Sequence, residues 1–245
     1  TIDIPKCYEG IEGQTITISG GTIDIVSSDD GLNAAGGADQ SGFGGRGPDR
    51  FSGSSDSSIA ISGGTLRIDA SGDGIDSNGA LTVSGGEIYV SGPTSDGDSA
   101  IDHDGSATVT GGTVIAAGYS GMAQNFGTDS TQGSILLTSR STSTQTIRVT
   151  DASGSVLAEF APAKAYSCVI VSTPALKQGD TYTVTMGGES TDVTLESLIY
   201  GTGGTGGGMG GQPGGGNMGM PPDGNGGGMG TPPDGNGGKG GRPGQ

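Results

Sequence analysis

Apolar and polar residues alternate in paired short runs along the first half of the chain. In the copy ITISGGTIDI, which begins at Ile16, a Gly-Gly pair separates the two runs. Alternation with a period of two indicates strands that bury one face, and glycine between two runs indicates a corner. Equivalent copies begin at Ile59, Leu81 and Ala107.

The copies recur at a period of about 22 residues or its double, and a segment of the form acid-Gly-apolar-acid typically follows each one. A fixed period of this size is typical of a solenoid, in which each coil buries its apolar face only against its neighbours. Two strands, a corner and a third short strand in every coil predict an all-β protein built as a single-stranded parallel β-helix.

The repeat pattern divides the chain into three regions. We expect residues 1–133 to form the parallel β-helix, with a Gly-rich loop inserted at 35–58, where no repeat is visible. Strand-like runs in 134–200 predict an antiparallel β cap over the open end of the helix, or equally a small β-sandwich. Residues 201–245 are rich in Gly, Pro, Met and Asn, which predicts a disordered, flexible tail or a segment for self-association.

Charge narrows the range of partners. The formal net charge is −16, from 26 acidic and 10 basic residues, so nucleic acid is excluded and cations are the natural partners.

No stretch approaches the roughly 20 apolar residues that cross a bilayer, so no membrane span is expected. Because the chain opens within a partial repeat, we expect Thr1 to be an internal residue of a longer precursor with any targeting segment upstream.

The acidic segments carry the candidate chemistry. Parallel strands lie about 4.8 Å apart, so equivalent carboxylates on successive coils become neighbours. Two such charges repel by about 3 kcal/mol at an effective dielectric constant of 20. Carboxylate, amide and carbonyl oxygens suit Ca²⁺, and the number of acids predicts more than one ion. A solvated acidic edge is the alternative. The candidate ligands are Glu9, Glu12, Asp29, Asp30, Asn33, Asp73, Asp76, Asp98, Asp102 and Asp104.

Catalytic chemistry has little support in the sequence. His103 is the sole histidine, so neither a His-based zinc site nor a Ser-His-Asp triad can be composed. The run Asp102-His103-Asp104-Gly105 lacks the remaining features of an EF-hand loop. A lyase would need a base near its metal, and only Lys6 and Arg67 are candidates. We therefore expect binding without cleavage and assign no catalytic residue.

An outward-facing row of the second strand is the candidate carbohydrate surface. Tyr89 offers a face for stacking a sugar ring, and Arg67 and Asp24 offer charged and hydrogen-bonding groups. Ile115 continues the row, and ordinary surface variety is the alternative. Cys7 and Cys168 lack metal-type spacing, and whether they form a disulfide is left open.

Several phrases together resemble one family. These are YEGIEG at Tyr8, ISGGTIDI at Ile18, SDDGLNA at Ser28, GDGIDSNG at Gly72 and the run SGGEIYVSGPT. They are similar to secreted clostridial carbohydrate-binding proteins with a calcium-decorated right-handed β-helix related in fold to pectate lyases. The resemblance covers about residues 1–200 and implies secretion or cell-surface display, calcium, and binding of cellulose or pectic polyuronate. The ligands that it implies are Glu9, Glu12, Asp29, Asp30, Asn33, Asp73, Asp76 and Asp102.

Two other functions remain open at this level. One is a calcium-dependent polysaccharide lyase that acts on polyuronate, and fold similarity alone does not carry that activity over. The other is a structural surface or matrix protein that self-associates through an open helix end or the Gly-rich tail. The last coil departs from the ligand pattern of the resemblance at Ser120 and Ala123, which argues against a metal ion there.

Overall fold

The computed structural model describes residues 1–35 and 56–202, and these residues form β-strands without any helix. Most of the inserted loop predicted at 35–58 and nearly all of the tail predicted at 201–245 lie outside the described residues. The all-β class predicted from the alternating pattern is confirmed. Within the described part, no helix is long and apolar enough to cross a membrane.

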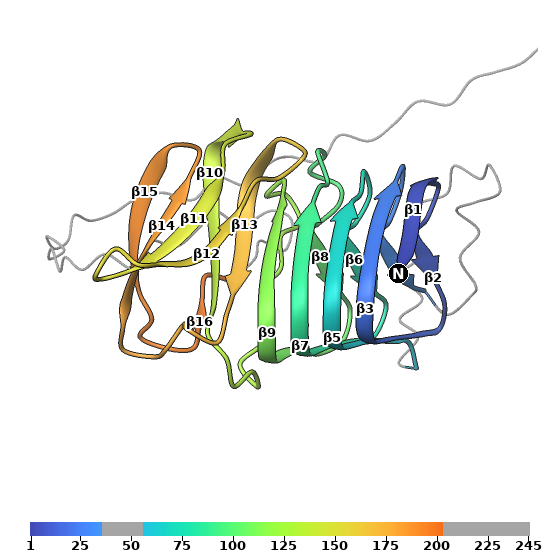
Figure 1. Ribbon diagram of the computed structural model, residues 1–245, viewed down its shortest axis with the longest axis horizontal. Helices are drawn as coiled ribbons and strands as arrows, with labels where there is room; N and C mark the ends of the chain where they lie inside the picture. The colour runs from blue at the N-terminus through green and yellow to red at the C-terminus, as the bar shows by residue number, and fades with distance from the viewer. Residues whose placement is uncertain (36–55, 203–245) are drawn as a thin grey trace, which may run out of the picture. The chain divides into compact units, whose positions relative to one another are not determined.

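The repeated phrases form one side of a large sheet (Figure 1). Its first five strands are every second strand of the chain, and neighbours among them pair in parallel. They are β1 (Ile2–Cys7), β3 (Thr15–Ser27), β5 (Ser58–Asp69), β7 (Ala80–Ser91) and β9 (Ala107–Gly118). Equivalent positions of successive copies face one another, as in the row Ile16, Ile59, Leu81 and Ala107. The predicted parallel stacking of the copies is therefore confirmed.

The corner predicted at each Gly-Gly pair is not a strand boundary. Each copy instead forms one continuous strand of 12 or 13 residues, with the glycines in its middle. The second glycine of the pair has a positive φ, for example 90° at Gly21 and 92° at Gly64, and the register shifts there before the pairing resumes. The glycine pair thus shifts the register without ending the strand, because glycine adopts a positive φ at little steric cost.

The short acidic segments form a second parallel sheet. Its four strands have two or three residues each: β2 (Ile11–Glu12), β4 (Leu32–Ala34), β6 (Ile75–Ser77) and β8 (Ile101–His103). The chain alternates between the two sheets, because each of these strands lies between two successive long strands. Ile and Leu from both sheets share one core, in which Leu32, Ile59 and Leu81 are at most 1% exposed.

The C-terminal strands are mixed in direction. Strand β13 (Tyr166–Ser172) pairs antiparallel with both β9 and β10 (Ser134–Ser143), and β16 (Ile199–Tyr200) pairs in parallel with β10. The eight-stranded sheet is therefore mixed and not purely parallel. A separate antiparallel sheet contains β12 (Val156–Phe160), β11 (Ile147–Asp151), β14 (Thr181–Met186) and β15 (Glu189–Thr194), in that spatial order.

A second core lies under these C-terminal strands. It contains Ile147, Val149, Tyr166 and Val184, all at most 1% exposed. Ile115 from β9, which the alternation placed on the outer face, is also buried in this core at 1% exposure. The outer row of β3, β5 and β7 is therefore covered where it reaches β9.

Candidate metal centre

Three of the predicted ligands converge in the structure. Asp30 directly precedes Gly31 and β4, Asp73 precedes Gly74 and β6, and Asp76 lies within β6. One carboxylate oxygen from each lies within 4.8 Å of the others, and all three residues are partly buried. In the described part of the chain, this is the group of three or more acidic, His or Cys side chains that is close enough to share one metal ion.

Backbone hydrogen bonds between successive copies hold two of these aspartates in line. The amide of Asp73 donates to Oδ1 of Asp30 over 2.7 Å, and the amide of Ser99 donates to Oδ1 of Asp73. Each carboxylate therefore accepts a hydrogen bond from the copy that stacks on it. The repeat itself imposes this arrangement, because in-register parallel strands bring equivalent turns together.

The electrostatics of the group are unfavourable for charge. Burial raises the pKa of Asp30 from 3.8 to about 8, and the nearby charges of Asp76 and Asp29 add to the rise. Burial also raises the pKa of Asp73 well above its ordinary value, with the charge of Asp30 as the next cause. The hydrogen bonds from Asp73 and Ser99 lower these pKa values but do not offset the burial.

The residues present fit a hard divalent cation. Two oxygens that bind one Ca²⁺ at about 2.3 to 2.6 Å can be separated by at most about 5 Å, which agrees with the 4.8 Å group. The donors are carboxylate oxygens, with no thiol or imidazole among them, and this set suits Ca²⁺ or Mg²⁺ better than a softer metal. A bound cation would favour the ionised aspartates and so lower their pKa values.

Asp76 also belongs to a row of predicted ligands on the short strands. Glu12 pairs with Asn33, Asn33 with Asp76, and Asp76 with Asp102 in the parallel register of the short strands. The side-chain amide of Asn33 donates a hydrogen bond to Oε2 of Glu9 over 3.3 Å. Burial is also the main cause of the raised pKa of Asp102. The acidic row therefore continues on both sides of the three-aspartate group.

The remaining predicted ligands have other surroundings. Asp29 is adjacent to the group and contributes to the raised pKa of Asp30, but it is not one of the three. Asp98 accepts a hydrogen bond from the Ser95 hydroxyl in the loop that precedes β8. Asp104 follows β8 in a turn and likewise lies outside the group.

Sequence reasoning missed two side chains near the acidic rows. Nε2 of Gln124 donates to Oδ1 of Asp102, which extends the row into the last copy. Lys164, from the segment between β12 and β13, approaches the turn before Asp73. Neither residue belongs to the repeated pattern, so the repeat carried no signal for them.

The residues of the predicted carbohydrate surface contact one another. Nη1 of Arg67 lies 3.6 Å from Oδ1 of Asp24, and its guanidinium carbon lies 5.8 Å from the ring centre of Tyr89. The ring centroid of Tyr89 lies 5.4 Å from that of Phe160 in β12. Arg67 and Asp24 retain side-chain exposures of 56% and 42%, so this end of the row faces solvent.

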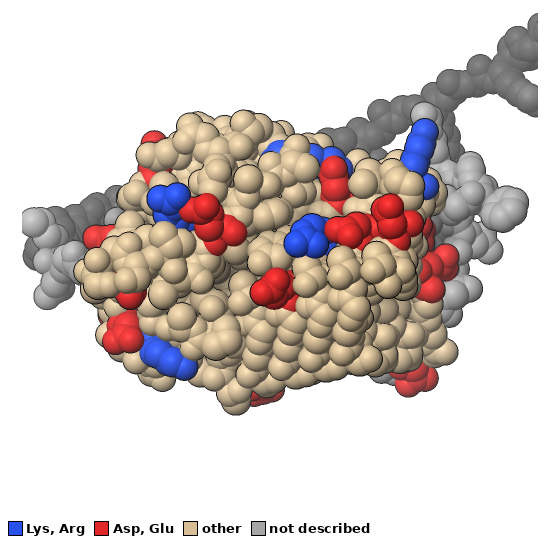
Figure 2. All heavy atoms as spheres, in the orientation of Figure 1, with Lys and Arg blue, Asp and Glu red and all other residues tan. Residues whose placement is uncertain are grey.

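The lower halves of the long strands present a different surface. Figure 2 shows a broad area without charged side chains there, whereas most acidic and basic groups of this view lie higher on the face. The sequence agrees, because the first halves of β3, β5, β7 and β9 contain Thr, Ser, Ala and apolar residues only. Thr17, Thr82 and Thr110 are exposed on this area.

Within the described residues, the cysteines and two surface hollows contribute no further cluster of metal-binding side chains. Cys7 and Cys168 are both free, and five strand-to-strand steps of about 4.8 Å separate their strands in the sheet order. Two open hollows lie around Thr144 and Gln145 and contain no acidic side chain. Comparisons of the chain with protein-family models, curated proteins and solved structures give no match.

Proposed function

We propose that the protein is a secreted or cell-surface, calcium-stabilised polysaccharide-binding protein that does not cleave its ligand. The observation that carries the proposal is the convergence of Asp30, Asp73 and Asp76 within 4.8 Å, with raised pKa values for Asp30 and Asp73. Isolated from a cation, such a group resists ionisation near neutral pH. A bound Ca²⁺ supplies the positive charge that allows all three carboxylates to ionise together.

The proposed architecture is a right-handed parallel β-helix. Its support is the alternation of the chain between two parallel sheets and the in-register pairing of successive copies in both. Such a scaffold has a functional consequence, because it repeats any surface group at a fixed spacing of about 4.8 Å. A regular ladder of this kind suits an extended polymer better than a small molecule.

The proposed ligand is a plant-type or matrix polysaccharide, either cellulose or a pectic polyuronate. Two surfaces of the long strands support this class: the exposed Arg67 and Asp24 beside Tyr89, and the uncharged area with Thr17 and Thr82. Hydroxyl-rich sugars can hydrogen bond with Thr and Ser, and Arg67 can bind a uronate carboxylate as a bidentate donor. The metal group could further bridge to uronate carboxylates.

The test is binding to both polymers with and without calcium. Co-sedimentation with insoluble cellulose and affinity electrophoresis in polygalacturonate should detect binding with calcium, and EDTA should weaken it. Arg67→Ala should weaken polymer binding and leave calcium affinity unchanged, whereas Arg148→Ala, at a similarly exposed arginine of the C-terminal sheet, should change neither. Failure of the calcium-loaded protein to bind either polymer would contradict the polysaccharide proposal. Release of unsaturated, ultraviolet-absorbing products would instead identify a lyase.

A further inference from the structure

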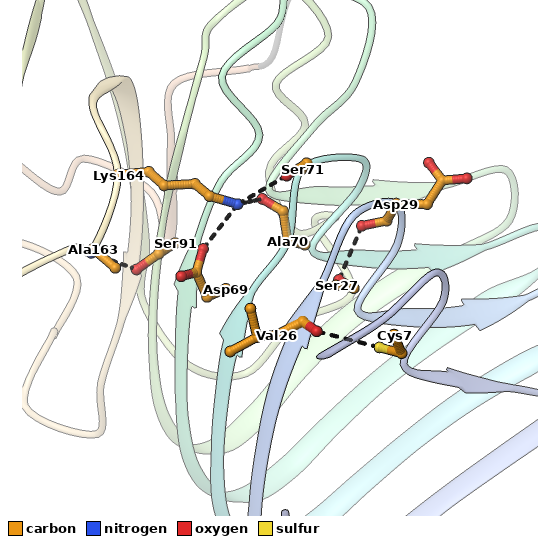
Figure 3. A network of polar contacts seen from close by, with 10 residues as sticks. All are labelled: Cys7, Val26, Ser27, Asp29, Asp69, Ala70, Ser71, Ser91, Ala163 and Lys164. Atoms are coloured by element: carbon orange, nitrogen blue, oxygen red, sulfur yellow. Dashed lines mark hydrogen bonds and ion pairs between the residues drawn. The ribbon is translucent and has the colours of Figure 1, made fainter. Parts of the chain in front are cut away.

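Lys164 connects the C-terminal strands to the turn that carries Asp73. The residue lies between β12 and β13, outside the repeats. Its ammonium donates to the carbonyl oxygen of Ala70 over 2.5 Å and to the hydroxyl of Ser71 over 3.1 Å, and it forms an ion pair with Asp69 at 2.8 Å. Figure 3 shows its side chain extended toward these three consecutive residues.

The contact is partly shielded and has a neighbour. The side chains of Lys164 and Asp69 are 23% and 32% exposed, so water screens this pair less than a surface pair. The preceding residue adds a second link, because the amide of Ala163 donates to the Ser91 hydroxyl over 2.9 Å. Two adjacent residues of one segment thus bind the ends of two neighbouring strands, β5 and β7 (Figure 3).

The turn held by Lys164 leads directly to the metal group. The amides of Ser71 and Gly72 both donate to the carbonyl oxygen of Asp29, over 3.3 and 3.1 Å, and Asp30 follows in the chain. A Cβ at Gly72 would lie 2.4 Å from Oδ1 of Asp30, so the turn packs tightly against that carboxylate. The amide of Asp73 then donates to the same Oδ1 atom. The position of the turn therefore sets the separation of Asp30 and Asp73.

From these contacts, we propose that Lys164 is a positioning residue of the metal group, which makes cation affinity depend on the C-terminal strands. The inference rests on the proposed function, since it assumes that Asp30, Asp73 and Asp76 bind a divalent cation. Lys164 does not touch the three carboxylates in this role. It fixes the backbone from Asp69 to Gly72, and the hydrogen bonds of that backbone align Asp73 with Asp30. By linkage, cation binding should in turn strengthen the docking of the C-terminal segment.

The experiment compares Lys164→Met with Arg148→Met in the full chain. Methionine keeps an unbranched side chain of similar length and removes the charge and the donors. Arg148 forms an ion pair with Glu159 within the C-terminal sheet, which is more exposed than the pair of Lys164 and Asp69 and lies away from the turn, so it controls for the loss of an ion pair as such. Calcium titration by calorimetry should show an affinity about tenfold or more weaker in Lys164→Met, as for other outer-shell partners of metal ligands, and unchanged in Arg148→Met. Lys164→Arg should restore most of the affinity.

Amide hydrogen exchange of the calcium-free proteins provides a readout that does not depend on the metal. In Lys164→Met, the amides of Ser71, Gly72 and Asp73 should exchange faster, while those of β14 and β15 keep their wild-type rates. Unchanged exchange in the turn, or a uniform increase across the chain, would overturn the positioning role. If the wild-type protein binds no calcium, the proposed function fails, and the exchange result alone decides whether Lys164 positions the turn.

Discussion

The repeat strands and the C-terminal antiparallel sheet arrange their polar side chains in opposite ways. In the parallel short strands, Asn33, Asp76 and Asp102 stack in one row because equivalent positions of successive copies are neighbours. In the antiparallel sheet, different sequence positions face one another. Arg148 there meets Glu159 in an ion pair of 2.5 Å, and Thr183 donates to Asp192 over 2.7 Å.

The difference between the two regions shows how a repeat brings like charges together. A row built from copies of one motif places like charges together, and the repulsion must be relieved by protonation, by variation of the sequence or by a bound ion. On the long strands the sequence varies, and Arg67 occupies the position that faces Asp24 and forms an ion pair with it. Asp30, Asp73 and Asp76 are all acidic, and a cation is the proposed solution there.

The largest expected effect is a dependence of metal-free stability on pH. The folded-state pKa of Asp30 is raised from 3.8 to about 8, so the folded protein binds this proton more tightly than the unfolded chain does. The resulting stabilisation is complete below the ordinary pKa and is lost as pH rises toward the folded-state value. The free energy of unfolding in EDTA should fall by up to about 1.4 kcal/mol per pH unit in this window.

Denaturant unfolding in EDTA at a series of pH values measures this slope. Asp30→Asn should flatten it, because the amide does not titrate and keeps the volume of the side chain. An identical slope in the wild type and in Asp30→Asn would show that the pKa of Asp30 is not raised in the folded protein. The matched control is Asp151→Asn in the antiparallel region, where hydrogen bonds from Ser153 and Ser155 lower the pKa of an exposed carboxylate.

A truncation in the stacked core is expected to have the next largest effect. Leu81 is fully buried, and it lies between Ile59 and Ala107 in one row. Leu81→Ala should reduce the free energy of unfolding by about 2 to 5 kcal/mol, because it opens a cavity that neighbouring copies cannot fill. Denaturant unfolding with calcium present measures the loss. A loss below about 1 kcal/mol would indicate that the copies repack and do not form a rigid stack.

Substitutions at two glycines with similar backbone conformations have the next largest expected effect, and the size of that effect should differ between the two regions. Gly64 has a φ of 92°, and an added Cβ would lie 2.8 Å from backbone atoms of Gly20 and Gly21 in the adjacent copy. Gly154 has a φ of 84° in the antiparallel hairpin, with nothing within 4 Å of an added Cβ. Gly154→Ala should cost about 1 to 2 kcal/mol from backbone strain alone, and Gly64→Ala should cost more. Equal losses in thermal unfolding would contradict close stacking of the copies.

The smallest expected effect is the loss of the surface ion pair in the antiparallel sheet. Arg148 and Glu159 have side-chain exposures of 53% and 46%, so water screens their attraction. Removing the pair should change the free energy of unfolding by about 0.2 to 1 kcal/mol. A double-mutant cycle with Arg148→Met and Glu159→Gln isolates the pairwise part. A coupling of several kcal/mol would mean that this region also depends on charge for its stability.

The sequence predicted the features that follow from its repeat. The alternation of Ile and Val predicted the buried rows, and the spacing of the copies predicted that acidic residues of successive copies, such as Asp30 and Asp73, lie close together. These predictions succeeded because parallel stacking converts a sequence period into a spatial neighbour. Register, core and acidic group are all consequences of one pattern.

Features that depend on unrelated parts of the chain could not be predicted in this way. The ring of Phe160 against Tyr89, the burial of Ile115 and the reach of Lys164 to Ala70 all bring C-terminal residues to the repeats. Tertiary contacts of this kind leave no periodic signal. The strand break expected at Gly64 was wrong for a local reason, since the register shifts at the glycines and the pairing continues on the far side.

Cation binding by the three aspartates is measured most directly by the thermal midpoint of unfolding during a calcium titration at neutral pH. In the wild-type protein, after treatment with EDTA and its removal, the midpoint should rise steadily with calcium concentration, because an ion that binds only the folded state stabilises it. Asp73→Asn, which removes one of the three charges, should lose most of that rise. A wild-type midpoint that does not change from chelated to calcium-saturated conditions, with no heat of binding by calorimetry, would rule out calcium binding by these aspartates.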